Sequence, residues 1–119
     1  MAGSPLCHFE IMSNNVEKAQ AFYGAVLGWT FEKWPGPMDY ITIKTGAPPE
    51  GGMMQKPPQA PMPMLSVYFL VPDVDATLAK ATEHGARVLM GKTPIPEVGA
   101  FAMFMDPEGI PVSILEEKK

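Results

Sequence analysis

The chain contains an internal repeat, in which residues of the first half recur 58 positions later in the second half. The tripeptide Pro49-Glu50-Gly51 recurs as Pro107-Glu108-Gly109, and 107 − 49 is 58. The same shift carries Val16 onto Val74. A period of this size indicates one supersecondary unit used twice. Because two copies of one unit are related by a pseudo-twofold axis, we expect equivalent positions of the two halves to face each other across a shared cleft.

Each half has the pattern of a strand, a helix and three further strands. The helices are expected after the N-cap candidates Ser13-Asn14-Asn15 and Asp73, and they should end near Gly28 and Gly85. In the first helix, Val16, Ala19, Tyr23 and Val26 fall at helical spacing and should face the core. The first half is expected to contain strands near 7–11, 29–34, 40–44 and 52–56. The second half is expected to contain strands near 65–71, 87–91, 100–105 and 110–116.

Length and charge limit the possible architectures and partners. The 119 residues fit one domain, with module one at about 6–57, a proline-rich connector at 57–63 and module two at about 64–117. The net charge of −4 and the scattered Lys and Arg residues argue against a nucleic-acid surface. No apolar run is long enough to cross a membrane, and no signal-peptide pattern opens the chain. With a single cysteine, Cys7, the chain fits a reducing cytoplasm.

Strand alternation separates two faces in the first half. Cys7, Phe9 and Ile11 should pack against a helix, whereas His8 and Glu10 should lie on the opposite face and line the cleft. Side chains at positions i and i+2 of a strand are close enough for their tips to meet. A carboxylate beside the imidazole would raise the pKa of His8 and could orient His8 as a general base.

The second half gives matching faces. Val67, Phe69, Val71, Val112 and Ile114 should pack inward, whereas Ser66, Tyr68, Leu70, Ser113 and Leu115 should line the cleft. The Tyr68 hydroxyl either donates to a ligand or points into water. The last four residues, Glu116 to Lys119, are expected to form a solvated tail.

Four segments carry a resemblance to a known family. They are His8-Phe9-Glu10-Ile11, the stretch Ala21–Trp29 (AFYGAVLGW), the stretch Phe69–Asp75 (FLVPDVD), and Asp106-Pro107-Glu108-Gly109. With two βαβββ units, the chain resembles the vicinal oxygen chelate superfamily of glyoxalases, bleomycin-resistance proteins and extradiol dioxygenases. The resemblance implies an α+β fold in which two tandem βαβββ modules form a curved eight-stranded mixed sheet with a cleft. It also implies a homodimer. The alternative fold is a ferredoxin-like dimeric α+β domain.

In that family, four inner-strand positions offer metal ligands. The offset of 58 pairs His8 with Ser66 and Gln55 with Ser113, so the resemblance places the quartet at these four residues. One imidazole, one amide and two hydroxyls, without a carboxylate, would bind a metal poorly. We therefore expect neither a catalytic metal nor a cofactor, although a shifted register would bring in Glu10 or Glu116.

Three functions stay open at this point. The first is metal-independent binding of a small, partly apolar molecule in the cleft, through His8, Glu10, Gln55, Ser66, Tyr68 and Ser113. The second is a divalent-metal-dependent lyase, isomerase or dioxygenase of the same superfamily. The third is a metal-free enzyme that transfers protons through His8 and Glu10. The sequence does not decide whether the protein is an enzyme, and it assigns no catalytic residue.

Overall fold

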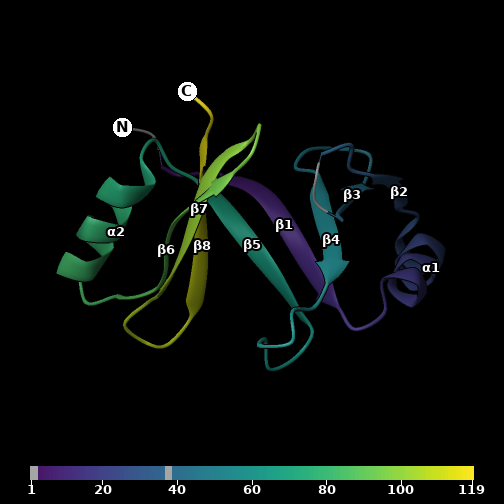
Figure 1. Ribbon diagram of the computed structural model, residues 1–119, viewed down its shortest axis with the longest axis horizontal. Helices are drawn as coiled ribbons and strands as arrows, with labels where there is room; N and C mark the ends of the chain where they lie inside the picture. Colours follow the sequence, from purple (N-terminus) through teal and green to yellow (C-terminus); the bar gives the residue numbers. More distant parts are fainter. Residues whose placement is uncertain (1–2, 37–38) are drawn as a thin grey trace. The chain divides into compact units, whose positions relative to one another are not determined.

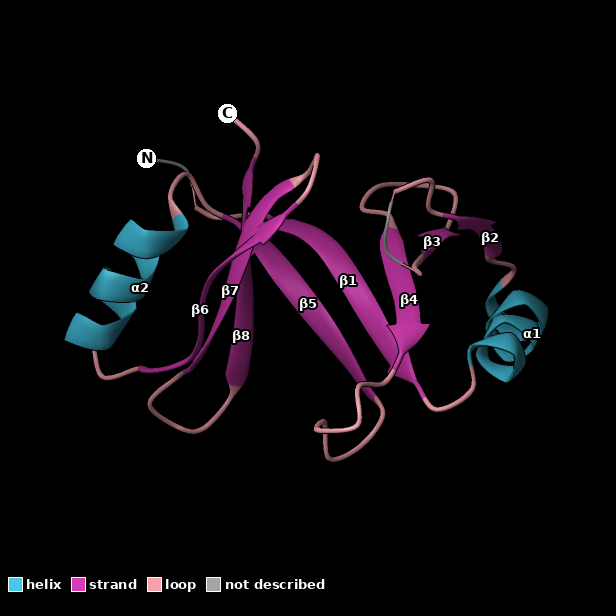
Figure 2. Ribbon diagram, viewed as in Figure 1, coloured by secondary structure: helices cyan, strands magenta, loops and turns pink. Residues whose placement is uncertain are grey.

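The computed structural model describes residues 3–36 and 39–119, and its helices and strands follow the order βαβββ twice. The first module contains β1 (Leu6–Ser13), α1 (Val16–Leu27), β2 (Thr30–Lys33), β3 (Ile41–Lys44) and β4 (Gly51–Gln55). The second contains β5 (Met64–Leu70), α2 (Val74–Glu83), β6 (Arg87–Ile95), β7 (Gly99–Met105) and β8 (Pro111–Glu117). Figure 1 shows these elements along the chain, and Figure 2 shows one helix beside the strands of each module. The expected α+β class and the doubled βαβββ order are confirmed.

The chain divides into two compact units, an N-terminal unit of residues 8–66 and a C-terminal unit of residues 3–7 and 67–119. The strands of the mixed sheet follow the order β2-β3-β4-β1 in the first module and β5-β8-β7-β6 in the second. Each module has one parallel pair, β1 with β4 or β5 with β8, and two antiparallel pairs on one side of it. The two modules therefore repeat the same pairing scheme.

In the N-terminal unit, α1 covers one face of the sheet. Asn15 is its N-cap and accepts a hydrogen bond from the Lys18 main-chain N–H, and Gly28 ends it in the left-handed conformation with φ of 70°. The core consists of the buried residues Ile11, Ile43 and Met53, with Phe9, Val16, Ala19, Tyr23, Trp29, Phe31 and Ile41 packed around them. Ile11 and Met53 are partners across β1 and β4, so this row points toward the helix.

In the C-terminal unit, α2 covers the sheet in the same way. Asp73 caps its first turn by accepting from the Ala76 main-chain N–H at 2.9 Å. The core consists of Val71, Val74, Leu78, Ala102 and Ile114, with Phe104 and Val112 packed against it. The expected inward direction of Val71 and Ile114 is confirmed.

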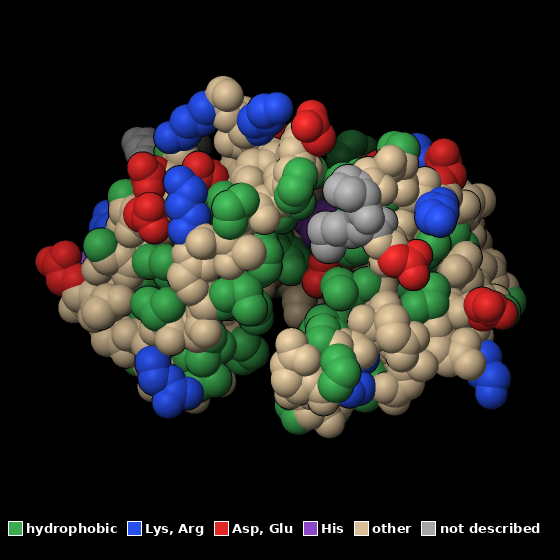
Figure 3. All heavy atoms as spheres, in the orientation of Figure 1, with side chains coloured by type: hydrophobic (Ala, Val, Ile, Leu, Met, Phe, Trp, Pro, Cys, Tyr) green, Lys and Arg blue, Asp and Glu red, His purple; other side chains and the backbone are tan. Residues whose placement is uncertain are grey.

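Several expected core or surface positions are wrong. Val26 is 60% exposed and Val67 is 40% exposed, because neither belongs to the packed cluster of its unit. Glu116, expected in a solvated tail, is only 6% exposed, because its carboxylate accepts the first main-chain N–H of α2, that of Val74, at 2.8 Å. Residues Val88, Leu89 and Met90 of β6 are between 41% and 44% exposed, and Figure 3 shows hydrophobic side chains on the surface of both units.

The offset of 58 does not extend to the last strand of each module. It holds for the helix caps, since Asn15 and Asp73 are 58 residues apart. Glu10, however, pairs with Gly52 in the first module, whereas Tyr68 pairs with Ser113 in the second. Because 68 − 10 is 58 but 113 − 52 is 61, the structural equivalent of Ser113 is Gly52 and not Gln55.

Candidate functional site

In the N-terminal unit, His8 and Glu10 are linked by the hydroxyl of Tyr40, which lies just before β3. The Tyr40 hydroxyl donates to Glu10 Oε2 at 2.9 Å, and His8 Nε2 lies 3.0 Å from the same oxygen. Since the single hydroxyl proton goes to Glu10, a hydrogen bond between His8 and Tyr40 requires the imidazole tautomer that carries its proton on Nε2. The Tyr40 ring also stacks on His8 at 6.5 Å and meets Trp34 edge-on at 6.2 Å. The expectation that His8 and Glu10 share one face is confirmed, with Tyr40 as a bridge that the sequence did not indicate.

Two consecutive glycines of β4 leave room for aromatic rings on opposite faces of the sheet. A Cβ on Gly51 would lie 2.3 Å from the Phe9 ring, on the face that α1 covers. A Cβ on Gly52 would lie 1.7 Å from the Tyr40 hydroxyl oxygen. The absence of a side chain at Gly52 is therefore what allows the Tyr40 hydroxyl to reach His8 and Glu10. A glycine within a strand is a known sign of such a close approach.

The pKa of His8 is lowered from its ordinary value of 6.5, chiefly because burial disfavours the charged imidazolium. A hydrogen bond with the main chain of Glu50 acts in the opposite direction but is the smaller effect. The expected upward shift is therefore wrong, because the neighbouring carboxylate does not outweigh desolvation. Burial therefore favours the neutral form of the His8 imidazole.

In the C-terminal unit, the expected site residues Tyr68 and Ser113 are direct partners across β5 and β8. Both are buried, with Tyr68 at 7% and Ser113 at 3% exposure, and the Tyr68 ring meets Phe101 edge-on at 6.3 Å. The thiol of Cys7 donates to the Tyr68 main-chain carbonyl at 3.5 Å. Burial raises the pKa of the Cys7 thiol, and the negative charge of Glu117 adds to this effect. Cys7 is thus a poor nucleophile.

Of the other expected site residues, Gln55 lies apart from the Tyr40 bridge. Gln55 pairs with Ser13, three positions along β1 from the pair of Glu10 and Gly52. Because side chains alternate between the two faces of a strand, Gln55 lies on the face that α1 covers, opposite to Glu10. Its exposed amide donates to the main-chain carbonyl of Asn14 at 2.8 Å. Ser66 is half-buried in β5. Within the N-terminal unit, the structure groups His8 and Glu10 and separates Gln55 from them.

The family's metal chemistry requires donors that these strands do not supply. With Gly52 in place of Gln55, the corrected quartet contains one imidazole, two serine hydroxyls and a glycine. Glu116 does not repair the set, since its carboxylate binds the N-terminus of α2 and lies 3.7 Å from Lys92. Across residues 3–36 and 39–119, no three His, Cys, Asp or Glu side chains gather in an arrangement able to hold a metal ion. The residues present do not fit a catalytic divalent metal.

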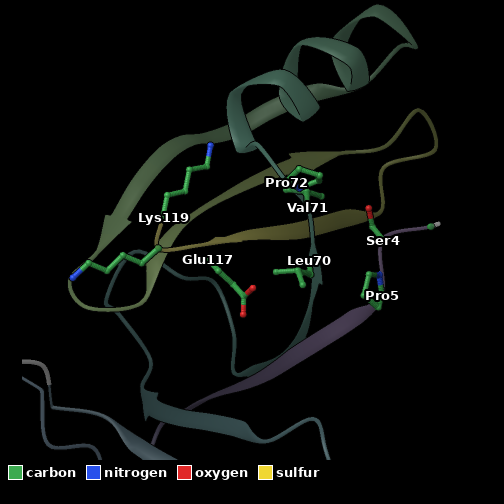
Figure 4. Close-up of a pocket in the computed structure, with 9 residues that line it drawn as sticks. Ser4, Pro5, Leu70, Val71, Pro72, Glu117 and Lys119 are labelled. Carbon is green, nitrogen blue, oxygen red and sulfur yellow. The ribbon is translucent and has the colours of Figure 1, made fainter. Parts of the chain in front are cut away.

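A separate hollow of the C-terminal unit lies between residues 3–5, the end of β5 and residues 117–119. Figure 4 shows Pro5, Leu70, Pro72 and Glu117 around it, with the Lys119 side chain at its border. The charged groups that line it are Glu117, Lys118 and Lys119, all at the end of the chain. None of the expected site residues lines this hollow.

No helix in the part of the chain that the structure describes is long and apolar enough to cross a membrane.

Known proteins with similar sequences support the resemblance seen in the motifs. The family model of the Glyoxalase/Bleomycin resistance protein/Dioxygenase superfamily matches residues 6–114. Proteins named "Putative glyoxylase CFP32" from Mycobacterium bovis and Mycobacterium tuberculosis are each 37% identical over 109 residues, which cover 90% of this chain. The chain spans only 42% of the length of these relatives.

Solved structures share the fold at low sequence identity. Methylmalonyl-CoA epimerase from Mycobacterium tuberculosis has a TM-score of 0.74 and 15% identity, with 100% of this chain and 93% of that chain covered. The hypothetical protein BH1468 from Bacillus halodurans has a TM-score of 0.75 and 13% identity, with 99% and 97% covered. At these identities the likeness concerns the fold alone. The match of the family model over residues 6–114 shows that this chain belongs to the Glyoxalase/Bleomycin resistance protein/Dioxygenase superfamily.

Proposed function

We propose that this protein binds a small, partly apolar molecule through the sheet faces opposite its helices, without a catalytic metal. The observation that carries the proposal is the Tyr40 hydroxyl, which binds both His8 and Glu10 through hydrogen bonds of 3.0 and 2.9 Å. The one imidazole of the expected ligand set is thereby engaged by a phenol. A hydrogen-bonding site with aromatic walls suits an organic molecule better than a metal ion.

The composition of these faces supports a partly apolar ligand. By strand alternation, the face opposite α1 carries His8, Glu10, Met12, Tyr40, Thr42 and Met54. The face opposite α2 carries Tyr68, Leu70, Phe101, Met103, Ser113 and Leu115. Both sets combine aromatic rings and methionine side chains with a few hydroxyl groups, and the first set also contains the Glu10 carboxylate. Such surfaces adapt to flat organic molecules and fix their orientation through a few hydrogen bonds.

A thermal-shift screen with small aromatic compounds of different charge tests this function. A ligand present at one hundred times its Kd should stabilise the fold by about 2.7 kcal/mol, and the shift in Tm should persist in excess EDTA. Tyr40→Ala should reduce the shift, whereas Phe22→Ala, which truncates an exposed residue of α1, should leave it unchanged. A ligand that stabilises the protein only when a divalent metal is added would contradict the proposal.

Metal-free proton transfer is the second candidate, and the continuous chain of His8, Tyr40 and Glu10 favours it. The Glu10 carboxylate, held by a phenol that a neutral imidazole supports, is able to accept a proton from a bound carbon acid. Incubation of a ligand from the screen in D2O tests this reaction. Deuterium incorporation into the ligand that Glu10→Gln abolishes would support catalysis, and no incorporation with the intact protein would leave binding as the function.

A further inference from the structure

The Tyr40 hydroxyl occupies the place that a side chain on β4 would otherwise take. Gly52 is the structural equivalent of Ser113. Gly52 is the strand partner of Glu10, and Ser113 is the strand partner of Tyr68. Glu10 and Tyr68 are themselves related by the offset of 58. A Cβ on Gly52 would lie 1.7 Å from the Tyr40 hydroxyl oxygen. The first module therefore supplies its polar group at this position through Tyr40, which precedes β3, whereas the second module supplies the Ser113 hydroxyl of β8.

This hydroxyl also lies within hydrogen-bond distance of the two atoms that an ion shared by His8 and Glu10 would bind. Zinc binds imidazole nitrogen and carboxylate oxygen at about 2.0–2.2 Å. The Tyr40 oxygen lies 3.0 Å from His8 Nε2 and 2.9 Å from Glu10 Oε2, which are hydrogen-bond distances to the same two atoms. An ion bound to both atoms on the side of Tyr40 would need the space that the hydroxyl occupies. Tyr40 cannot withdraw toward β4 without approaching the main chain at Gly52 more closely.

We propose that Tyr40 determines the specificity of this site by excluding divalent metal ions from His8 and Glu10 and keeping both residues in a hydrogen-bonded set. This inference rests on the proposed metal-free function and names the residue that enforces it. Removing the hydroxyl, or replacing the phenol with a shorter donor, should open His8 and Glu10 to a metal.

Titration with zinc alone, followed by calorimetry, tests the inference on the full chain. Tyr40→His replaces the phenol with a shorter imidazole, which leaves room for an ion and adds a third donor. We expect this variant to bind zinc at least about tenfold tighter than the starting protein. Tyr40→Phe keeps the ring but removes the oxygen, and a smaller gain of several-fold is expected. Combining Tyr40→His with His8→Ala should remove the gain.

A matched control adds a histidine elsewhere. Phe22 is 58% exposed on α1, so Phe22→His introduces an imidazole without touching the site and should not change zinc affinity. Two-dimensional amide NMR spectra confirm that each variant is folded. If Tyr40→His does not fold, the zinc affinity of Tyr40→Phe is compared with that of the starting protein instead. Tighter zinc binding by Tyr40→Phe is again the expected result.

The outcomes separate this inference from the proposed function. If neither folded variant binds zinc more tightly than the starting protein, and the starting protein does not bind it, the role of Tyr40 is refuted while metal-free binding stands. If the starting protein binds one zinc ion per chain and loses it in His8→Ala, both proposals are overturned. A gain in Tyr40→His that persists after His8→Ala would also refute the inference, because the ion would lie elsewhere.

Discussion

Replacing Gly52 with alanine should break the hydrogen-bonded set of His8, Glu10 and Tyr40. The new Cβ would lie 1.7 Å from the Tyr40 hydroxyl oxygen and 2.1 Å from the carbon that bears it, so the phenol must move away. Two hydrogen bonds are then lost, one of them to a carboxylate. A neutral hydrogen bond contributes about 0.5–1.5 kcal/mol and one to a charged group about 1.5–3 kcal/mol. Because the groups are only partly buried, we expect Gly52→Ala to cost about 2–4 kcal/mol.

Gly91→Ala is the matched control. Gly91 also lies in a strand, β6, but a Cβ there would meet nothing within 4 Å. Its replacement should change the free energy of unfolding by less than about 0.5 kcal/mol. Urea unfolding of both variants at pH 7.5, followed by circular dichroism, measures the difference.

A double-mutant cycle attributes the cost to Tyr40. Tyr40→Ala removes the phenol that the new Cβ displaces, so Gly52→Ala should cost markedly less in that background, with a coupling energy of about 1–3 kcal/mol. The reasoning would be refuted if Gly52→Ala cost no more than Gly91→Ala. It would also be refuted if the effects of Gly52→Ala and Tyr40→Ala were additive.

Four further outcomes are expected. Glu116→Ala should cost about 1–3 kcal/mol, because it removes the buried acceptor for the first N–H of α2, whereas Glu117→Ala should cost less than about 0.5 kcal/mol in the same urea assay. Ile114→Ala should cost about 2–5 kcal/mol and Val67→Ala less than about 0.5 kcal/mol, since Ile114 is 2% exposed and Val67 is 40% exposed. Because the pKa of His8 is lowered in the folded state, the neutral form of His8 favours folding. This contribution to stability is present above about pH 6.5 and is lost as the pH falls through the lowered pKa. His8→Gln should remove this part of the pH dependence of stability, measured by urea unfolding. The homodimer remains a prediction, and light scattering coupled to size-exclusion chromatography should give twice the chain mass of 12.9 kDa, with a monomer at all concentrations as the contrary result.

The order of helices and strands was predictable because local signals mark it. Asn15 and Asp73 accept hydrogen bonds from the first turns of α1 and α2, and Gly28 adopts the left-handed conformation that favours glycine. Alternation in β1 also placed His8 and Glu10 correctly on one face. These features depend on neighbours in the sequence, which is why the sequence pattern contained them.

The offset between β4 and β8 was not predictable from the repeated tripeptide. Gly51 lies in a strand opposite Phe9, whereas Gly109 lies in a turn with φ of 94°, where its main-chain N–H donates to Asp106. The same three residues therefore serve different local structures, and strand pairing sets the true register. That difference moved the equivalent of Ser113 from Gln55 to Gly52.

Tyr40 was missed because its contacts cross strands that are distant in the sequence. It lies 30 residues from Glu10 and 32 from His8, and no periodic pattern connects the three. The signal that could have indicated it is the pair Gly51-Gly52 within a strand, since adjacent glycines there imply close approach on both faces. The lowered pKa of His8 was equally hidden, because desolvation depends on packing that appears only in three dimensions.

The absence of a catalytic metal is the central claim, and elemental analysis tests it most directly. The protein should be purified without chelators and without metal-affinity steps, and its content of nickel, zinc, manganese and iron should then be measured per chain by mass spectrometry. Because Tyr40 engages His8 and Glu10, and Gly52 offers no donor, the metal content should be far below one ion per chain. One equivalent of any of these metals, lost on His8→Ala, would contradict the account.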